Sequence, residues 1–160
     1  MKNNFWKNKK IFITGHTGFK GSWLVLILNS LGAKITGYAL NPISKPNFFD
    51  NLGLSRFLEN EYRDDINNFS KLNKAIKKSK PSIVFHLAAQ SSVLVSYQNP
   101  EETIKTNIIG TFNVLKAIKS NQSIKSAIIV TTDKVYLNDD KKINFNENSK
   151  LGGYDIYSSS

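Results

Sequence analysis

The chain has 160 residues, no cysteine and a formal net charge of +10 at pH 7. This length predicts one domain, and the lack of cysteine excludes disulfides and thiolate metal sites, which suits a reducing cytoplasm. The lysines are scattered without any nucleic-acid-binding motif, and the longest apolar run, Trp23–Leu28, is too short for a bilayer, so we expect a cytoplasmic protein with neither a nucleic-acid nor a membrane partner.

The first half of the chain alternates β-rich runs with a helical pattern. Lys10–Thr14 predicts a first strand, the apolar spacing of Ser22–Leu31 predicts a helix, and Lys34–Leu40 predicts a second strand. Asn41–Leu58 contains prolines and predicts an irregular excursion, and a weak third strand follows near Glu61–Arg63.

The second half continues the alternation. Phe69–Ser79 predicts a helix, Ser82–Ala88 a strand buried on both faces, and Asn99–Lys119 a helix that opens with Asn-Pro-Glu-Glu. Lys125–Thr132 predicts another buried strand, and Asp139–Leu151 a polar loop. The whole pattern predicts an α/β, Rossmann-type, doubly wound parallel sheet that forms one domain over residues 1–160.

A glycine-rich segment, TGHTGFKG at Thr14–Gly21, lies between the first strand and its helix. In a dinucleotide fingerprint Gly15 would permit the tight turn, Gly18 would let the backbone approach a pyrophosphate, and Gly21 would let the helix pack on the sheet. A plain strand–helix turn is the alternative. The cofactor-binding residues predicted here are Gly15, Thr17, Gly18, Phe19 and Gly21.

The second strand ends without the acidic residue that usually binds the cofactor ribose. That place holds Ala39, Leu40 and Asn41, of which Asn41 can still bond a hydroxyl. Because no arginine stands there for a 2′-phosphate, NAD is favoured slightly over NADP.

The three-residue glycine spacing resembles that of the extended short-chain dehydrogenase/reductase family. The resemblance continues along the chain and implies further cofactor-binding residues. They are Asp65 and Ile66 at the adenine, Leu87, Ala88, Ala89 and Gln90 in the loop beside the cofactor, and Asn107 as a structural asparagine.

Thr132, Asp133, Lys134 and Tyr157 fall where the family has its active site. The tracts TTDKVY and YSSS are similar to the sugar-nucleotide 4,6-dehydratases of this family, which implies NAD as cofactor and a nucleotide sugar, CDP-glucose, as substrate. Tyr157 would take the C4 hydroxyl proton with Thr132 bonded to the same hydroxyl. Asp133 would be the acid and Lys134 the base of the water elimination.

In the family, three residues such as Ser-Ser-Ser separate the tyrosine from a lysine, so that lysine would follow Ser160. The resemblance therefore implies that this chain is the cofactor-binding part of such an enzyme, without the C-terminal substrate domain, and is inactive alone. It also implies that the full-length protein forms a homodimer. The alternatives are a nucleotide-sugar epimerase or reductase of the same family, or a non-catalytic NAD-binding protein. The Asp133-Lys134 pair favours dehydration over epimerisation.

Other polar residues receive weaker assignments. His86, in an apolar strand, is expected to be a core histidine, and with only one other histidine in the chain a zinc site is not expected. Lys20, inside the fingerprint, would face either phosphate or solvent. Tyr97 matches a family stretch near the substrate.

Overall fold

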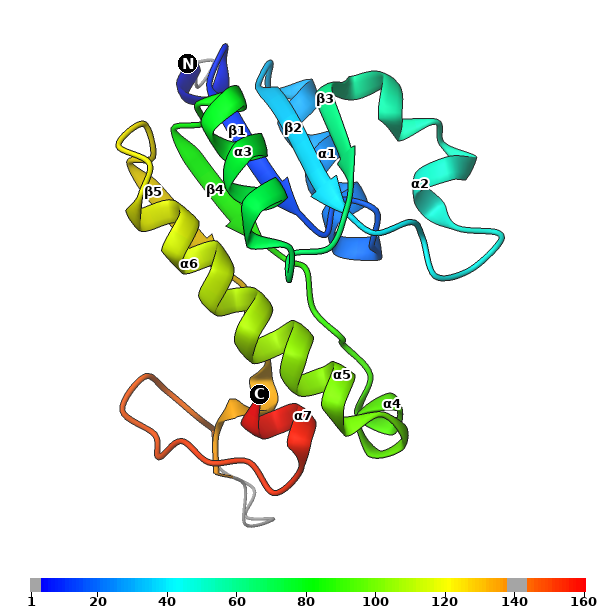
Figure 1. Cartoon of the computed structure of the whole chain (residues 1–160), viewed down its shortest axis with the longest axis vertical. Coiled ribbons are helices and arrows are strands. Elements are labelled where there is room, and N and C mark those ends of the chain that lie inside the picture. Colours follow the sequence, from blue (N-terminus) through cyan, green and yellow to red (C-terminus); the bar gives the residue numbers. More distant parts are fainter. Residues whose placement is uncertain (1–3, 138–143) are drawn as a thin grey trace.

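The computed structural model of the chain describes residues 4–137 and 144–160. Its centre is a five-stranded sheet in the order β3-β2-β1-β4-β5, in which every neighbouring pair is parallel (Figure 1). The strands are β1 (Lys10–Thr14), β2 (Lys34–Ala39), β3 (Leu58–Arg63), β4 (Ile83–His86) and β5 (Ser126–Ile129). The predicted Rossmann-type α/β fold is confirmed.

Helices connect the strands and cover both faces of the sheet. The α-helices are α1 (Phe19–Ser30), α2 (Phe48–Asn51), α3 (Phe69–Ser79), α4 (Val93–Gln98), α5 (Pro100–Ile104), α6 (Thr111–Lys119) and α7 (Ile156–Ser159). The shorter turns are η1 (Asn4–Trp6), η2 (Leu54–Phe57) and η4 (Asp133–Val135), and η3 (Lys105–Gly110) is a π-helical segment.

The alternation of side chains along β1 divides the core into two layers. Ile11 and Ile13 pack with Val25 and Leu28 of α1 on one face of the sheet. Phe12 points to the other face and joins a cluster with residues of α3 and α6. Since successive residues of a strand face opposite sides, a single apolar strand supplies both cores.

The long helix across the second half has a clear start and an unpredicted irregularity. Asn99 accepts a hydrogen bond from the Glu102 N–H and Pro100 takes the first helical position, as predicted. The helix runs through α5, η3 and α6 with helical backbone at each junction and ends at Lys119, so the predicted Asn99–Lys119 helix is confirmed. The π-helical turn that brings Asn107 into η3 was not predicted.

Several boundaries differ from the sequence predictions. Helix α1 begins at Phe19 rather than Ser22, because its first turn is made by the end of the glycine segment itself. The weak third strand is longer than predicted, and α4 was not predicted. Part of the predicted polar loop, 138–143, lies outside the described residues.

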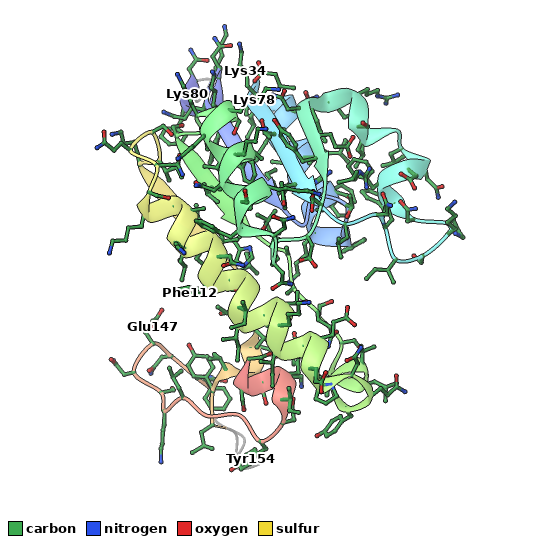
Figure 2. The ribbon with its side chains drawn as sticks, viewed as in Figure 1. Lys34, Lys78, Lys80, Phe112, Glu147 and Tyr154 are labelled. Atoms are coloured by element: carbon green, nitrogen blue, oxygen red, sulfur yellow. The ribbon has the colours of Figure 1, made fainter. Side chains whose placement is uncertain are left out.

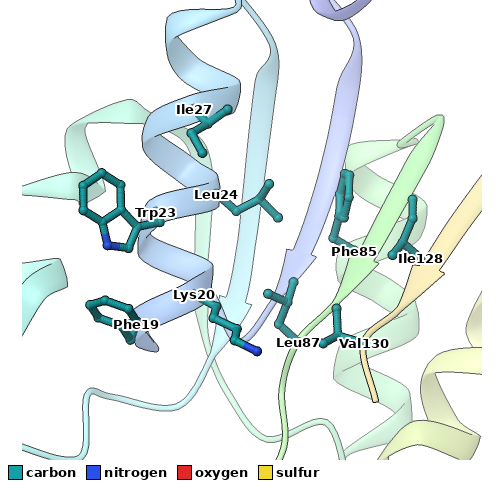
Figure 3. A pocket seen from close by; sticks show the side chains of 9 residues that line it. All are labelled: Phe19, Lys20, Trp23, Leu24, Ile27, Phe85, Leu87, Ile128 and Val130. Carbon is teal, nitrogen blue, oxygen red and sulfur yellow. The ribbon is translucent and has the colours of Figure 1, made fainter. Parts of the chain in front are cut away.

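The prediction that the last strand is buried was wrong. In β5, Ser126, Ala127 and Ile128 are exposed, because this strand forms an edge of the sheet. Between α1 and the β4–β5 side of the sheet lies an apolar hollow of about 360 Å³ (Figure 3). Its lining residues are Phe19, Lys20, Trp23, Leu24, Ile27, Phe85, Leu87, Ile128 and Val130.

The two ends of the molecule carry different labelled side chains in Figure 2. Lys34, Lys78 and Lys80 lie at one end, and Tyr154 and Glu147 lie at the other, on the C-terminal segment (Figure 2). Within the described residues, no helix combines the length and apolar character needed to cross a membrane.

Candidate active site

The glycine turn lies at the carboxyl edge of the sheet, directly after β1. Gly15 has a φ of +74°, and its N–H donates to the Tyr38 carbonyl over 2.9 Å. A Cβ at this position would stand 2.6 Å from the Ala88 nitrogen. Gly15 therefore allows both the left-handed turn and close passage against the loop after β4.

The other two glycines of the turn have different surroundings. A Cβ on Gly21 would lie 2.1 Å from the Gly15 carbonyl oxygen, so only glycine lets α1 pack here. A Cβ on Gly18 would meet only that oxygen at 3.4 Å, which is ordinary contact. The protein's own atoms therefore demand glycine at 21 but not at 18.

Gly18 is the N-cap residue of α1, and because glycine has no side chain, no side-chain cap accepts a hydrogen bond from the first N–H groups of the helix. The first N–H groups of a helix have no partner within the helix, and the dipole makes this end positive. Because Gly18 and Phe19 are exposed, an anion can reach these groups. The glycine turn therefore fits the pyrophosphate of a dinucleotide.

A buried hydrogen-bond network joins the end of β1, just before the turn, to β4 and α6. The Thr14 hydroxyl oxygen accepts from the N–H groups of Leu87 and Ala88 at 3.2 and 3.3 Å, so its own hydrogen goes to His86 Nδ1, 2.6 Å away. His86 Nε2–H then donates to Thr111 Oγ1 over 2.9 Å. Burial lowers the pKa of His86 to about 4. His86 is a neutral core histidine, as predicted.

The loop after β4 is tied to the long helix through Asn107. The Asn107 amide oxygen accepts from the Gln90 N–H over 2.8 Å, and its NH₂ donates to the Gln90 carbonyl over 3.1 Å. The Gln90 side chain donates to Thr103 over 2.9 Å. Leu87–Gln90 is thereby brought against Gly15 at the carboxyl edge, with Ala89 exposed.

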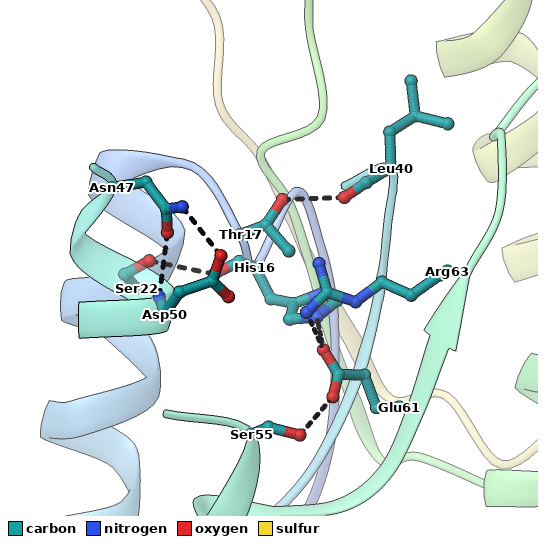
Figure 4. Close-up of polar contacts among 9 residues, drawn as sticks. All are labelled: His16, Thr17, Ser22, Leu40, Asn47, Asp50, Ser55, Glu61 and Arg63. Atoms are coloured by element: carbon teal, nitrogen blue, oxygen red, sulfur yellow. Dashed lines mark hydrogen bonds and ion pairs between the residues drawn. The ribbon is translucent and has the colours of Figure 1, made fainter. Parts of the chain in front are cut away.

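The end of β2 is joined to the turn by Thr17, whose hydroxyl donates to the Leu40 carbonyl over 3.0 Å. Sequence reasoning missed a polar cluster beside this bond, in which Glu61 contacts both His16 and Arg63 (Figure 4). It is assembled by the parallel pairing of β2 with β3, in which Ala39 is opposite Arg63. The sequence offers no local signal for that pairing.

The two predicted adenine residues follow β3. The Asp65 carboxylate accepts from the backbone and side-chain N–H groups of Asn67 at 2.8 and 2.9 Å. Ile66 is only 4% exposed and packs beneath Gly110. Asp65 is half-buried and its carbonyl accepts from the Tyr38 hydroxyl of β2 over 3.1 Å, whereas most of the Ile66 side chain belongs to the core.

The tract after β5 forms the short turn η4. Thr132 accepts from the Lys134 N–H over 3.2 Å and donates to the Asp133 carboxylate over 3.2 Å. Asp133 and Lys134 are exposed. They line a hollow of about 430 Å³ together with Tyr136, Phe145, Gly152, Gly153, Tyr154, Asp155 and Ser158.

Tyr157 lies in α7, which a reciprocal Asp155–Ser158 capping box begins. Hydrogen bonds from Ser158 lower the pKa of the Asp155 carboxyl, consistent with an ionised cap. Asn107 donates to the Ser160 hydroxyl over 2.9 Å and so joins α7 to the long helix. Within the described residues the Tyr157 phenol forms no hydrogen bond.

The structure therefore brings some of the predicted active-site residues together. Asp133 and Lys134 share one hollow with the residues that cap α7, but Thr132 and Tyr157 do not line it. Tyr97 projects from α4 and is 68% exposed. Lys20 is exposed and lines the apolar hollow of Figure 3 rather than the glycine turn.

The sequence matches known proteins along its whole length. The profile of the family described as GDP-mannose 4,6 dehydratase matches residues 12–160. The CDP-glucose 4,6-dehydratase of Salmonella typhimurium is 45% identical over 160 residues, which are 100% of this chain and 44% of that protein. The chain thus spans less than half the length of this relative.

Solved structures share the fold. UDP-glucose 4-epimerase of Thermotoga maritima, solved with UDP-glucose, is 28% identical to this chain, with a TM-score of 0.79. The match covers 93% of this chain and 46% of the epimerase chain. UDP-glucose 4-epimerase of Stenotrophomonas maltophila, solved with bound NAD, is 18% identical, with a TM-score of 0.79. That match covers 95% of this chain and 45% of the epimerase chain. At that identity the likeness supports the fold alone.

Proposed function

The chain belongs to the family described as GDP-mannose 4,6 dehydratase, and on that premise we propose that it is the NAD-binding domain of a CDP-glucose 4,6-dehydratase. The observation that carries the proposal is its 45% identity, over all 160 residues, to an enzyme of that name. The Asp-Lys pair of the η4 turn supports it, because elimination of water requires an acid and a base.

The glycine turn would hold the cofactor. NAD, when bound, supplies the hydride acceptor and donor of such a reaction. The free N–H groups at the start of α1 would bind the pyrophosphate, and Asp65 would lie near the adenine. The same fold holds NAD in a solved UDP-glucose 4-epimerase.

The residues near η4 and α7 would carry out the proton transfers. Tyr157 would take the proton of the sugar C4 hydroxyl while Thr132 donates a hydrogen bond to that oxygen. Oxidation at C4 acidifies the C5 proton, which Lys134 would take, and Asp133 would protonate the departing C6 hydroxyl so that it leaves as water. Because Lys134 is exposed here, its basic role requires the bound sugar to exclude water from it.

A second candidate is a nucleotide-sugar epimerase, which the likeness to the UDP-glucose 4-epimerase of Thermotoga maritima favours. Epimerisation would use Tyr157 but would need no acid–base pair after Thr132. The pair Asp133-Lys134 therefore separates the two activities.

We also propose that the full-length protein is a cytoplasmic homodimer built on the long helix. Ile104, Ile108, Phe112 and Leu115 are each more than 40% exposed along α5, η3 and α6. Their spacing forms an apolar stripe, which a second copy of the helix would cover.

The test of the function is Asp133→Asn in the full-length protein. Because general acid catalysis contributes roughly 100- to 10,000-fold, we expect water elimination from CDP-glucose to fall by at least about 100-fold with NAD binding unchanged. Glu147→Gln, a neutral replacement on the same segment but outside the hollow, is the matched control. Unchanged elimination in Asp133→Asn would refute the dehydratase assignment.

A further inference from the structure

Strand β3 carries, beside the end of β2, a charged cluster to which the proposed reaction assigns no role. The Glu61 carboxylate is at its centre. One oxygen lies 3.0 Å from His16 Nε2 and 2.6 Å from Arg63 Nη2, and the other accepts the Ser55 hydroxyl (Figure 4). The cluster adjoins the glycine turn, because His16 follows Gly15 directly.

His16 is the buried anchor of this cluster. Its side chain is fully buried, lies edge-on to Phe49 at 5.2 Å and fills the space where a Cβ on Gly37 would come within 2.7 Å of the ring. Burial lowers the pKa of His16, so its Nε2–H is the donor of a neutral ring to Glu61. The charges in the cluster are therefore those of Glu61 and Arg63.

Arg63 reaches the place where dinucleotide-binding folds position the ribose contact. In the parallel register it is opposite Ala39, whose small side chain leaves the end of β2 without a charged group. Figure 4 shows the guanidinium extending from β3 toward His16 and Thr17, next to the Thr17–Leu40 hydrogen bond. In such folds an acid at this place binds the 2′-hydroxyl of NAD, and a nearby arginine accommodates the 2′-phosphate of NADP.

The guanidinium retains unused hydrogen-bonding capacity. Its side chain is 31% exposed, and its face lies over the Phe49 ring at 5.0 Å. Within residues 4–137 and 144–160, Glu61 is the only hydrogen-bonding or ion-pair partner of this group. A guanidinium has five N–H donors, so several remain for a phosphate.

We propose that Arg63 and Glu61 set the choice between NAD and NADP in this protein, with Arg63 binding the 2′-phosphate and Glu61 opposing it. The inference rests on the proposed dinucleotide site. Arg63 attracts the 2′-phosphate, whereas the adjacent carboxylate repels it and occupies one edge of the guanidinium. The site therefore accepts NADP as well as NAD. Arg63 raises the affinity for NADP relative to NAD, and Glu61 lowers it.

The test is calorimetric titration of the chain with NAD and with NADP. Because hydrogen bonds to a charged partner are lost, Arg63→Gln is expected to weaken NADP binding roughly tenfold and to change NAD binding less than about twofold. Glu61→Gln keeps an acceptor for His16 while removing the repulsion, and is expected to strengthen NADP binding roughly tenfold. Arg56→Gln, which removes an arginine just before β3, at the opposite end of that strand, is the matched control.

The ratio of the two affinities separates specificity from folding, since a merely structural role of the cluster would alter both nucleotides together. Opposite shifts of the ratio in Arg63→Gln and Glu61→Gln support the proposal. An unchanged ratio in both variants, with NAD still bound, overturns it and leaves the cofactor site intact. If the unaltered chain binds neither nucleotide, the cofactor assignment fails and this inference fails with it.

Discussion

The turn at Thr14–Gly21 is built into the sheet, whereas the described part of residues 132–160 rests against the end of the molecule on a few polar contacts. Around the turn, Thr14, His16 and Gly21 are buried. In the C-terminal segment, Asp133, Lys134 and Tyr154 are exposed. The fold itself therefore shapes the glycine turn proposed to hold the cofactor, while the proposed proton-transfer residues depend on local turns.

Within the described residues, the C-terminal segment combines contacts within itself with a side-chain hydrogen bond to the long helix. Tyr136 forms an isolated antiparallel bridge with Leu151, and the Gly152 N–H donates to the Val135 carbonyl over 2.9 Å. Asn107 supplies a side-chain hydrogen bond to Ser160. Fewer buried contacts predict lower local stability, so the two regions are expected to respond differently to substitution and to pH.

The largest expected effect comes from Gly21→Ala. Its Cβ would lie 2.1 Å from the Gly15 carbonyl oxygen, which is backbone and cannot move aside. We expect a loss of about 3 kcal/mol in the free energy of unfolding, at the upper range for overpacking, measured by urea denaturation. Gly18→Ala, whose Cβ has ordinary contacts, is expected to cost less than about 1 kcal/mol but to weaken NAD binding. Equal destabilisation by both would contradict a turn packed in this way.

A smaller effect is expected from pH. The folded chain holds His86 neutral down to its pKa of about 4, whereas the unfolded chain protonates it below the usual 6.5. The unfolded state therefore binds more protons in this window, and stability falls as pH falls. His86 contributes a loss of roughly 2 kcal/mol between pH 7 and pH 5. His16, whose pKa is also lowered, acts in the same direction.

Urea midpoints at several pH values measure this dependence. In His86→Gln the His86 contribution is absent, so the slope between pH 7 and pH 5 should become shallower. An unaltered slope in that variant would mean that the buried network around Thr14 does not keep His86 neutral.

The smallest effect is expected from Asn107→Ala, which removes the bond to Ser160 and the bonds to Gln90. We expect a loss of about 1.5 kcal/mol in stability and faster hydrogen exchange of the α7 amides. Asn121→Ala, which removes an amide from the end of α6 away from α7, is the control. If both variants left the α7 amides equally protected, Asn107 would not be the link between the regions.

The same contrast explains what the sequence could predict. β1, α3 and the glycine turn were predictable because apolar spacing and glycines encode them locally. The exposure of β5 was missed because burial depends on which elements cover a strand, and an apolar strand at an edge looks like a central one. Arg63 was missed because only the register of β3 against β2 brings it opposite Ala39, at the end of β2. The roles of Thr132, Asp133, Lys134 and Tyr157 remain predictions.

The central claim is most directly tested by the product that the full-length protein carrying this chain forms from CDP-glucose and NAD. We predict CDP-4-keto-6-deoxyglucose, identified by NMR through loss of the C6 hydroxyl, with no net consumption of NAD. A C4 epimer of CDP-glucose in place of the deoxysugar would contradict the account and support the epimerase alternative.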